Sequence, residues 1–183
     1  MTVVELVAFL FGLLYLIGIS FSKRWGWLFG ILNAALYIYL CIDSQLYIQA
    51  NLQCIYVLFG AYGYVAWGQE AFAKVNSWAL GRHIVFIAAA ICLGLVFGFV
   101  LWEYSPQKTP FIDAFIAVFA IFATYLTAHH IIENWYYWIF INIASILLFL
   151  SQDLFITAGM YLVNLGMSFW GLYKWKTQKQ ATA

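Results

Sequence analysis

Long apolar runs alternate with short polar segments along the whole of this chain. A helix needs about 20 predominantly apolar residues to cross a bilayer, and seven runs come close to that length or exceed it. They predict an all-α membrane protein with seven transmembrane helices. No series of alternating strands of about ten residues, as in a membrane β-barrel, is visible. The predicted spans are Val3–Ser20, Arg24–Ile42, Tyr47–Trp67, His83–Tyr104, Phe111–Ala128, Asn134–Ser151 and Leu154–Trp175.

Short polar segments connect most of the predicted spans. The longest connection, about Gly68 to Arg82, separates the third span from the fourth. Both prolines, Pro106 and Pro110, fall in the predicted loop after the fourth span. Proline inside a helix removes a hydrogen bond and kinks the helix, so we expect seven uninterrupted helices.

Part of the first half of the chain recurs in the second half at a constant offset. The stretch QLYIQANLQ at Gln45–Gln53 resembles DLFITAGMY at Asp153–Tyr161, and YGYVAW at Tyr62–Trp67 resembles WGLYKW at Trp170–Trp175. Chance similarity between apolar helices is the alternative, but polar and glycine positions coincide as well. The matched pairs are Glu5 with Asp113, Leu46 with Leu154, Gly63 with Gly171, Trp67 with Trp175 and, after one inserted residue, Asn33 with Asn142.

Such a repeat predicts a three-plus-one-plus-three arrangement of the helices. Three spans reverse the direction of the chain and the fourth restores it, so the two copies would be parallel. Transporters built from parallel repeats hold their substrate near the middle of the membrane, between the halves. The predicted units are residues 1–68 (first repeat), 69–109 (cytoplasmic loop and linker helix), 110–176 (second repeat) and 177–183 (cytoplasmic tail).

Composition supports a multi-pass protein of the plasma (inner) membrane. The chain is 66% hydrophobic and 8% charged, with a mean hydropathy of +0.91, which excludes an ordinary soluble domain. Its net charge of +1 gives no reason to expect nucleic acid, and its three cysteines lie in apolar runs as core residues. No basic segment precedes the first apolar run, which we interpret as a span and not a signal peptide. Most lysines and arginines fall on the side of the C-terminus, which predicts a cytoplasmic C-terminus and an external N-terminus.

Titratable side chains offer little catalytic chemistry within the spans. Glu5 and Asp113 lie near the external ends of their spans and no acid lies mid-span, which argues against proton-coupled transport. His129, His130 and Glu133 lie together at the predicted cytoplasmic edge, but adjacent helical residues point about 100° apart and do not readily bind one metal ion. We expect no metal, no cofactor and no enzymatic activity. A membrane enzyme or signalling subunit that uses these three residues is the remote alternative.

The stretch ENWYYWIFIN at Glu133–Asn142 is the strongest candidate for a binding site. Trp135, Trp138 and Asn142 are three and four residues apart, so they share one face of a helix. Aromatic faces attract a cationic ring, and an amide offers both a donor and an acceptor. Tryptophan is also common in the interfacial belt of membrane proteins. A lone amide in lipid, by contrast, is costly without a partner or a ligand.

Neutral polar side chains elsewhere extend this candidate site. They suit a polar solute that carries hydroxyl or amide groups, although some could instead hydrogen-bond between helices. Interhelical bonding is the interpretation we favour for Ser145 and Ser168. Besides the three residues of the motif, the predicted substrate-binding residues are Asn33, Gln53, Asn164, Tyr37, Tyr56 and Tyr161.

The same residues resemble a known family. The pattern N-W-x-x-W-x-x-x-N at residues 134–142 resembles the sixth-helix motif of the PnuC family of vitamin transporters. FGILN at 29–33, QLY at 45–47, LQ at 52–53 and YGYVAW at 62–67 resemble the first half of the same family. The likeness covers the second, third, sixth and seventh spans, whereas the other spans match in hydropathy alone.

This resemblance implies a fold, a substrate and partners. Members of the family fold as three plus one plus three helices, like a full-length relative of the sugar-transporting SWEET proteins, and have been seen as trimers. The best known members take up nicotinamide riboside by facilitated diffusion, and a cytoplasmic kinase traps the substrate by phosphorylation. Asn142 in the motif looks more like the nicotinamide riboside type, while thiamine and riboflavin, carried by close relatives, are the alternatives. The implied partners are a cationic aromatic vitamin precursor, membrane lipid, the kinase and further copies in a homotrimer.

Overall fold

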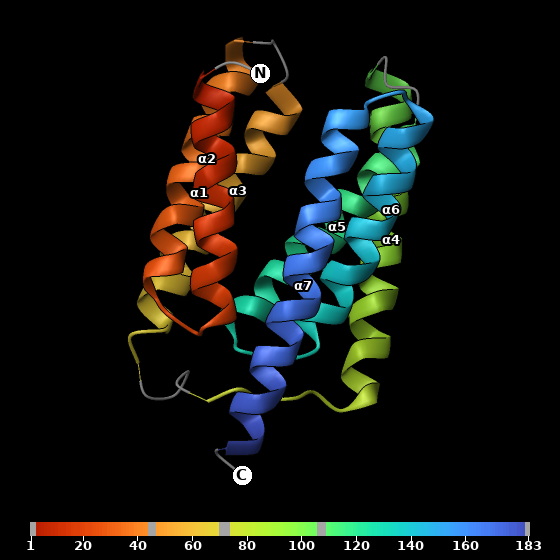
Figure 1. The fold of residues 1–183 in the computed structure, drawn as a ribbon. Coiled ribbons are helices and arrows are strands. Elements are labelled where there is room, and N and C mark those ends of the chain that lie inside the picture. Colours follow the sequence, from red (N-terminus) through yellow and green to blue (C-terminus); the bar gives the residue numbers. More distant parts are fainter. Residues whose placement is uncertain (1–2, 44–46, 70–73, 106–108, 182–183) are drawn as a thin grey trace.

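The computed structural model describes residues 3–43, 47–69, 74–105 and 109–181, which form seven helices (Figure 1). Each predicted span is a helix, so the all-α fold class is confirmed for the described part of the chain. Gln45, Leu46 and Pro106, which entered the sequence predictions, lie outside the described residues. The helices are α1 (Val3–Ser20), α2 (Trp25–Asp43), α3 (Tyr47–Ala66), α4 (Leu80–Tyr104), α5 (Pro110–Ala128), α6 (Asn134–Ser151) and α7 (Phe155–Ala181).

Several helix ends differ from the predicted ends, most of them by one residue and those of α4 and α7 by more. Helix α4 begins at Leu80, ahead of the predicted His83, and α7 continues to Ala181, beyond the predicted Trp175. Pro110, which we expected in the loop, is the first residue of α5. Proline fits there because the first N–H groups of a helix have no helical partner. The predicted ends follow hydropathy, whereas backbone hydrogen bonding continues past the point at which hydropathy falls.

Six of the helices in the described residues are long and apolar enough to cross a membrane, all except α3. Helix α3 has 20 residues, but three amides in its first half, Gln49, Asn51 and Gln53, lower its hydropathy. It nevertheless packs along α2. The predicted third span is therefore a helix of spanning length that is less apolar than the other six, because it carries polar side chains.

Helices α1 to α3 form one group, α5 to α7 form a second group, and α4 lies at the edge of the bundle beside α5 (Figure 1). Helix α2 packs against both α1 and α3, α6 packs against both α5 and α7, and α4 packs on α5. Contacts between the groups join α1 to α7 and α3 to α5. The offset of the sequence repeat relates α1 to α5 and α3 to α7, so these two contacts are equivalent under the repeat.

A glycine packs against a tryptophan ring at matching positions of the repeat in the two groups. Gly63 of α3 lies against the ring of Trp27 of α2, and Gly171 of α7 lies against the ring of Trp135 of α6. A methyl group at either glycine would overlap the ring. Small residues allow helices in a membrane to approach closely, and here each glycine makes room for an indole. The two pairs are related by the repeat offset.

The turns that follow α1 and α5 share a left-handed residue. Ser22 has φ 53° and His130, its equivalent under the repeat, has φ 55°. In the first turn the N–H of Lys23 donates to the carbonyl of Gly18 at 2.8 Å, and the equivalent bond in the second turn measures 3.0 Å. This bond pattern ends a helix with its last carbonyls satisfied. Both groups therefore connect their first two helices in the same way.

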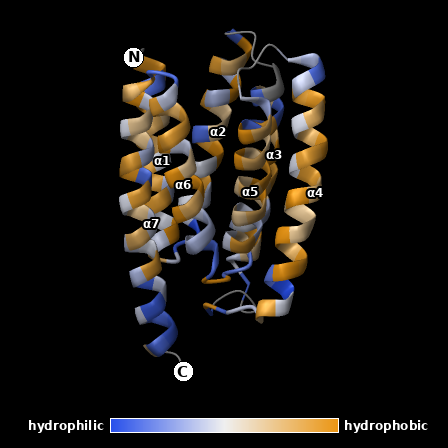
Figure 2. Cartoon of the chain, turned by 90° about the vertical axis from the view of Figure 1, so that its right-hand side faces the viewer, coloured by the Kyte–Doolittle hydropathy of each residue, from blue (hydrophilic) through white to orange (hydrophobic). Residues whose placement is uncertain are grey.

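Many large apolar side chains are exposed on the outside of the bundle. Polar residues concentrate in the connections and in the last turns of α7 (Figure 2). Such a surface is compatible with lipid tails and not with water. Helix α4 is the most exposed of the described helices, because α5 is the one described helix with which it makes extensive contact. Its exposed apolar residues include Ile84, Val85, Val96, Phe97, Phe99 and Trp102.

Candidate functional site

Asn142 of α6 forms a buried hydrogen bond with Ser168 of α7. Its Nδ2 atom donates to the Ser168 hydroxyl at 3.1 Å, and that hydroxyl donates to the backbone carbonyl of Asn164 at 2.8 Å. Asn142 is 3% exposed and Ser168 is 2% exposed. The predicted interhelical role of Ser168 is confirmed. The side chain of Asn164, another predicted site residue, is half-buried one helical turn away on α7.

Trp138 lies one helical turn before Asn142 and is half-buried. Its indole N–H points to the hydroxyl of Thr127 of α5 at 3.4 Å. The ring packs against two apolar clusters. One lies toward the C-terminal end of the bundle (Ile19, Trp27, Val75, Ala128, Ile132, Trp135, Leu172 and Trp175), and the other joins α5 and α6 (Ala120, Ala123 and Ile141). Along α6, Trp138 therefore lies between the first of these clusters and the buried amide of Asn142.

Trp135 is enclosed by other helices, with 1% of its surface exposed. Its ring meets Trp175 edge to face, with 5.4 Å between the ring centroids and an interplanar angle of 85°. Its indole N–H has no hydrogen-bond partner among the described residues. Trp135 is thus part of the first of the two apolar clusters, against which the ring of Trp138 packs.

Tyrosines from four helices gather near the motif. The phenol of Tyr56 lies near those of Tyr15 and Tyr161, and the phenol of Tyr161 lies near that of Tyr37. The ring of Tyr161 also stacks on Phe149 of α6 at 5.2 Å between centroids. All four tyrosines are half-buried. The structure brings the three predicted tyrosines together and adds Tyr15, which the sequence does not distinguish from the other aromatic residues of its apolar run.

The remaining predicted amides differ from Asn142. Asn33, its equivalent under the repeat, donates from Nδ2 to the backbone carbonyl of Ala8 at 2.7 Å and so ties α2 to α1. Gln53 is half-buried on α3. The repeat therefore places two amides at matching positions, but only one of them, Asn142, meets a side-chain hydroxyl.

Two further polar side chains near the motif were not among the predicted site residues. Thr127 of α5 accepts from Trp138 and lies 3.1 Å from the amide oxygen of Asn134. The Ser145 hydroxyl, fully buried on α6, has no hydrogen bond of standard geometry in the described residues, although it lies beside Tyr161. Nothing in the spacing of Thr127 relative to the motif signals its position, because it belongs to a different helix.

The three residues of the alternative cytoplasmic cluster have different partners. His129 lies 3.1 Å from the hydroxyl of Tyr62, and His130 stacks on Trp67 with 3.9 Å between ring centroids. Glu133 accepts from the hydroxyl of Ser77 and the backbone N–H of Trp78, and it lies 4.0 Å from His83. Each of these three side chains thus packs against, or hydrogen-bonds to, a different part of the protein. Within the described ranges, no three His, Cys, Asp or Glu side chains are placed to hold a metal ion.

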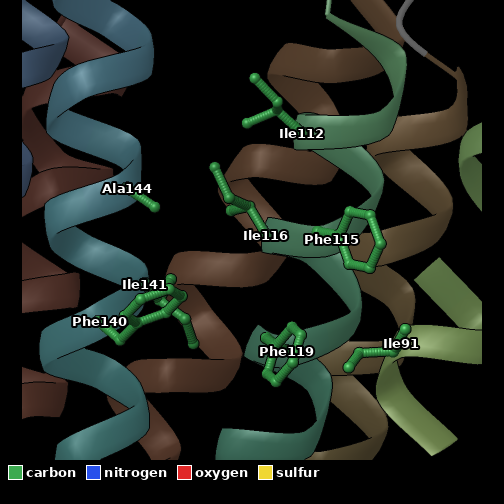
Figure 3. Close-up of a pocket in the computed structure, with 8 residues that line it drawn as sticks. All are labelled: Ile91, Ile112, Phe115, Ile116, Phe119, Phe140, Ile141 and Ala144. Atoms are coloured by element: carbon green, nitrogen blue, oxygen red, sulfur yellow. The ribbon is translucent and has the colours of Figure 1, made fainter. Parts of the chain in front are cut away.

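An apolar cavity of about 370 Å³ lies between α4, α5 and α6 (Figure 3). Its lining is entirely apolar and contains none of the predicted substrate-binding residues. The wall consists of Ile91, Ile112, Phe115, Ile116, Phe119, Phe140, Ile141 and Ala144. A polar solute would find no hydrogen-bonding partner there, so the candidate site remains the polar side of α6 around Asn142.

Comparison with known proteins identifies the family. A family model described as nicotinamide mononucleotide transporter matches residues 2–177. The chain belongs to this family. Membership confirms the resemblance to the PnuC family that the tryptophan–asparagine motif indicated. Together with the spanning helices, it makes the protein a multi-pass membrane transporter.

Individual relatives cover most of the chain. The nicotinamide riboside transporters PnuC of Escherichia coli and Shigella flexneri are each 26% identical to it, over 87% of this chain and 79% of theirs. The riboflavin/roseoflavin transporter RibM of Streptomyces davaonensis is 26% identical, over 69% of this chain and 62% of its own length. The crystal structure of the vitamin B3 transporter PnuC superposes with a TM-score of 0.79 at 23% identity, covering 97% of this chain and 82% of that one. This last likeness shows that the fold is shared.

Proposed function

We propose that this protein takes up nicotinamide riboside by facilitated diffusion, and that Trp138 and Asn142 are central to its substrate site. The observation that carries the proposal is the buried amide of Asn142, held by Ser168 one turn from the half-buried ring of Trp138. A buried amide in a membrane is costly unless it has a partner or a ligand. Here one end of the amide has a protein partner and the other end is left for a ligand.

The chemistry of nicotinamide riboside matches these side chains. Its pyridinium ring is cationic and suits the face of Trp138, because a desolvated cation–π contact contributes about 2 kcal/mol. Its carboxamide and ribose suit neutral amides and hydroxyls. Gln53, Asn164, Tyr37, Tyr56 and Tyr161 supply such groups on α2, α3 and α7.

The charge distribution favours the riboside over the mononucleotide named in the family description. A phosphate group is usually bound by arginine, lysine or helix N-termini. In the described part of the chain, every lysine and arginine lies in a connection or near a helix end: Lys23, Arg24, Lys74, Arg82, Lys174, Lys176 and Lys179. The middle of the described helices therefore offers no side-chain cation to a phosphate.

The arrangement of the helices supports transport between two parallel repeats. The group contacts α1 with α7 and α3 with α5 are equivalent under the sequence repeat, as a three-plus-one-plus-three transporter with α4 as the linker requires. In this proposal the C-terminus is cytoplasmic, and the positive charges at that end follow the positive-inside rule. Because a facilitator only equilibrates its substrate, accumulation depends on phosphorylation by a cytoplasmic kinase. A homotrimer is part of the same proposal.

Thiamine is the second candidate substrate, and riboflavin is the third. Thiamine is also a cationic aromatic compound, so the face of Trp138 would attract it for the same reason. Riboflavin has no fixed cation, but one relative at 26% identity is named as its transporter. The carboxamide distinguishes nicotinamide riboside from both.

Calorimetric titration of the purified full-length protein tests the proposal. Nicotinamide riboside, nicotinamide mononucleotide, thiamine and riboflavin are titrated in parallel into wild type, Trp138→Ala and Asn142→Ala. We expect the riboside to bind wild type and each variant to weaken binding about tenfold or more, the size of a lost contact of about 1.4 kcal/mol. Asn33→Ala is the matched amide control, because its side chain bonds to a backbone carbonyl of α1.

The outcomes separate the substrates. Binding of thiamine or riboflavin alone would move the chain to another branch of the family while keeping the fold. Normal riboside binding in both Trp138→Ala and Asn142→Ala would show that the site lies elsewhere. Replacing both His129 and His130 by glutamine tests the enzyme alternative, since loss of a measured catalytic activity in that variant would support it.

A further inference from the structure

A single hydroxyl on α7 sets the orientation of the Asn142 amide. Nδ2 of Asn142 donates to Oγ of Ser168 at 3.1 Å, while the same Oγ donates to the backbone carbonyl of Asn164 at 2.8 Å. A serine hydroxyl has one hydrogen to donate and two lone pairs. Because the hydrogen goes to the helix carbonyl, Ser168 accepts from the amide. The NH₂ group of Asn142 is therefore the end that faces α7.

The other end of the amide is the acceptor oxygen Oδ1. In the described part of the chain no group donates a hydrogen bond to this oxygen, and it is not sealed from contact by other atoms. An acceptor that loses its contact with water without gaining a donor costs about 1–3 kcal/mol, so a ligand that covers this oxygen has to donate a hydrogen bond to it. This oxygen is thus the atom that α6 offers to a ligand, and Ser168 determines that an acceptor and not a donor is offered.

We propose that Ser168 is a positioning residue that gives the site its preference for a carboxamide over a carboxylate. The inference rests on the proposed function and assigns a specificity role to a residue outside the tryptophan–asparagine motif. Nicotinamide riboside donates an N–H from its carboxamide to Oδ1 of Asn142. Its acid counterpart, nicotinic acid riboside, carries a carboxylate with acceptors only.

The geometry of the motif supports the carboxamide as the donor. Trp138 and Asn142 are four residues apart, so they lie one above the other on the same face of α6. The carboxamide is attached directly to the pyridinium ring, and a ring held against Trp138 therefore carries its carboxamide toward Asn142. A carboxylate there would bring two acceptor oxygens together with no hydrogen between them. Sites that hydrogen-bond a substrate N–H reject analogues that lack it, by about 10⁴–10⁵-fold in the strongest cases.

Loss of the Ser168 hydroxyl releases the amide. In Ser168→Ala the Asn142 side chain can turn by half a rotation and present its NH₂ group, which accommodates a carboxylate. The preference for the amide substrate then falls, while Trp138 and the rest of the site are unchanged. A purely structural role for Ser168 would instead weaken the binding of both compounds equally.

The experiment measures the affinities of nicotinamide riboside and nicotinic acid riboside for the purified full-length protein by calorimetry. Wild type, Ser168→Ala, Ser168→Cys, Ser168→Thr and the control Ser20→Ala are compared. Ser20 is buried and donates to the carbonyl of Leu16 at 2.8 Å, the same local bond as in Ser168 but with no amide attached. The Ser168→Thr variant keeps the hydroxyl, whereas the thiol of Ser168→Cys keeps the volume with weak hydrogen bonding.

The expected result is a fall of about tenfold in the ratio of the two affinities for Ser168→Ala, equivalent to about 1.4 kcal/mol. Ser168→Cys shows the same direction, and its near-native volume keeps the test available if the alanine variant does not fold. Ser168→Thr keeps most of the wild-type ratio, and Ser20→Ala keeps all of it. A wild-type ratio in both Ser168→Ala and Ser168→Cys would overturn the inference and leave the proposed function intact. Absence of riboside binding in wild type would overturn both.

Discussion

Trp67 and Trp175 are in ring contact, with 6.1 Å between their centroids, where the two groups of helices meet. The indole N–H of Trp67 donates to the carbonyl of Ala128 at the end of α5 at 3.0 Å. The indole N–H of Trp175 donates to the carbonyl of Ile19 near the end of α1 at 2.9 Å. Each group thus sends one tryptophan to the first helix of the other group. This reciprocal pair joins the groups at the end of the bundle that holds the C-terminus.

Removing the indole N–H of either Trp67 or Trp175 should lower the stability of the protein. Trp67→Phe and Trp175→Phe keep an aromatic ring but leave a buried carbonyl with one bond fewer, at a cost of about 1 kcal/mol each. We expect both variants to unfold at a lower temperature than wild type in the same detergent. Trp102→Phe is the control, since this ring is 60% exposed on α4. Wild-type unfolding temperatures in both test variants would show that the two bonds contribute nothing to stability.

Gly171 should not tolerate alanine, although Gly166 on the same helix should. A methyl group at Gly171 would overlap the ring of Trp135, whereas nothing lies within 4 Å of a methyl group at Gly166. Overpacking costs about 1–3 kcal/mol, and alanine is favoured over glycine in an open helical position by about 1 kcal/mol. Thermal unfolding of the two variants should therefore shift in opposite directions. Equal shifts would mean that the Trp135 ring moves aside without cost.

Glu133 should hold the segment before α4 against α6. Its carboxylate accepts from Ser77 at 2.7 Å and from the backbone N–H of Trp78 at 3.2 Å. In Glu133→Gln the charge is lost and one acceptor oxygen becomes a donor, so both charge-assisted bonds are weakened even if the new amide donates to the Ser77 hydroxyl. We expect faster amide hydrogen exchange in residues 74–79, measured by mass spectrometry. The control is Glu103→Gln, an exposed residue of α4, and equal exchange in both variants would contradict the role of Glu133.

Alanine at Asn33 should lower stability, whereas alanine at Asn142 should lower ligand affinity. Asn33→Ala removes the bond to the carbonyl of Ala8 that ties α2 to α1, and an interhelical bond of this kind contributes about 0.6–2 kcal/mol. We expect a lower unfolding temperature with ligand affinity close to wild type. Asn142→Ala, by contrast, should lose affinity. If Asn33→Ala lost affinity to the same degree, the two repeats would contribute equally to the substrate site.

Hydropathy and spacing were sufficient to predict the helices and the candidate motif. Lipid provides no partner for backbone groups, so each spanning segment must satisfy its own hydrogen bonds as a helix. For that reason the apolar runs became seven helices, with differences confined to their ends. The spacing of Trp135, Trp138 and Asn142 placed them on one face of α6, because the helical period is independent of the surroundings. The family followed from the same residues.

The partners of these residues depend on the packing of the whole bundle. A helix that is apolar on all sides carries little information about which face meets which neighbour. The repeat relates Asn33 to Asn142, yet one bonds to a backbone carbonyl and the other to Ser168. The orientation of the amide at Asn142 follows from a hydroxyl on another helix, and the reciprocal bonds of Trp67 and Trp175 follow from the contact between groups. Such pairings arise when several helices pack at once, and spacing within one helix does not encode them.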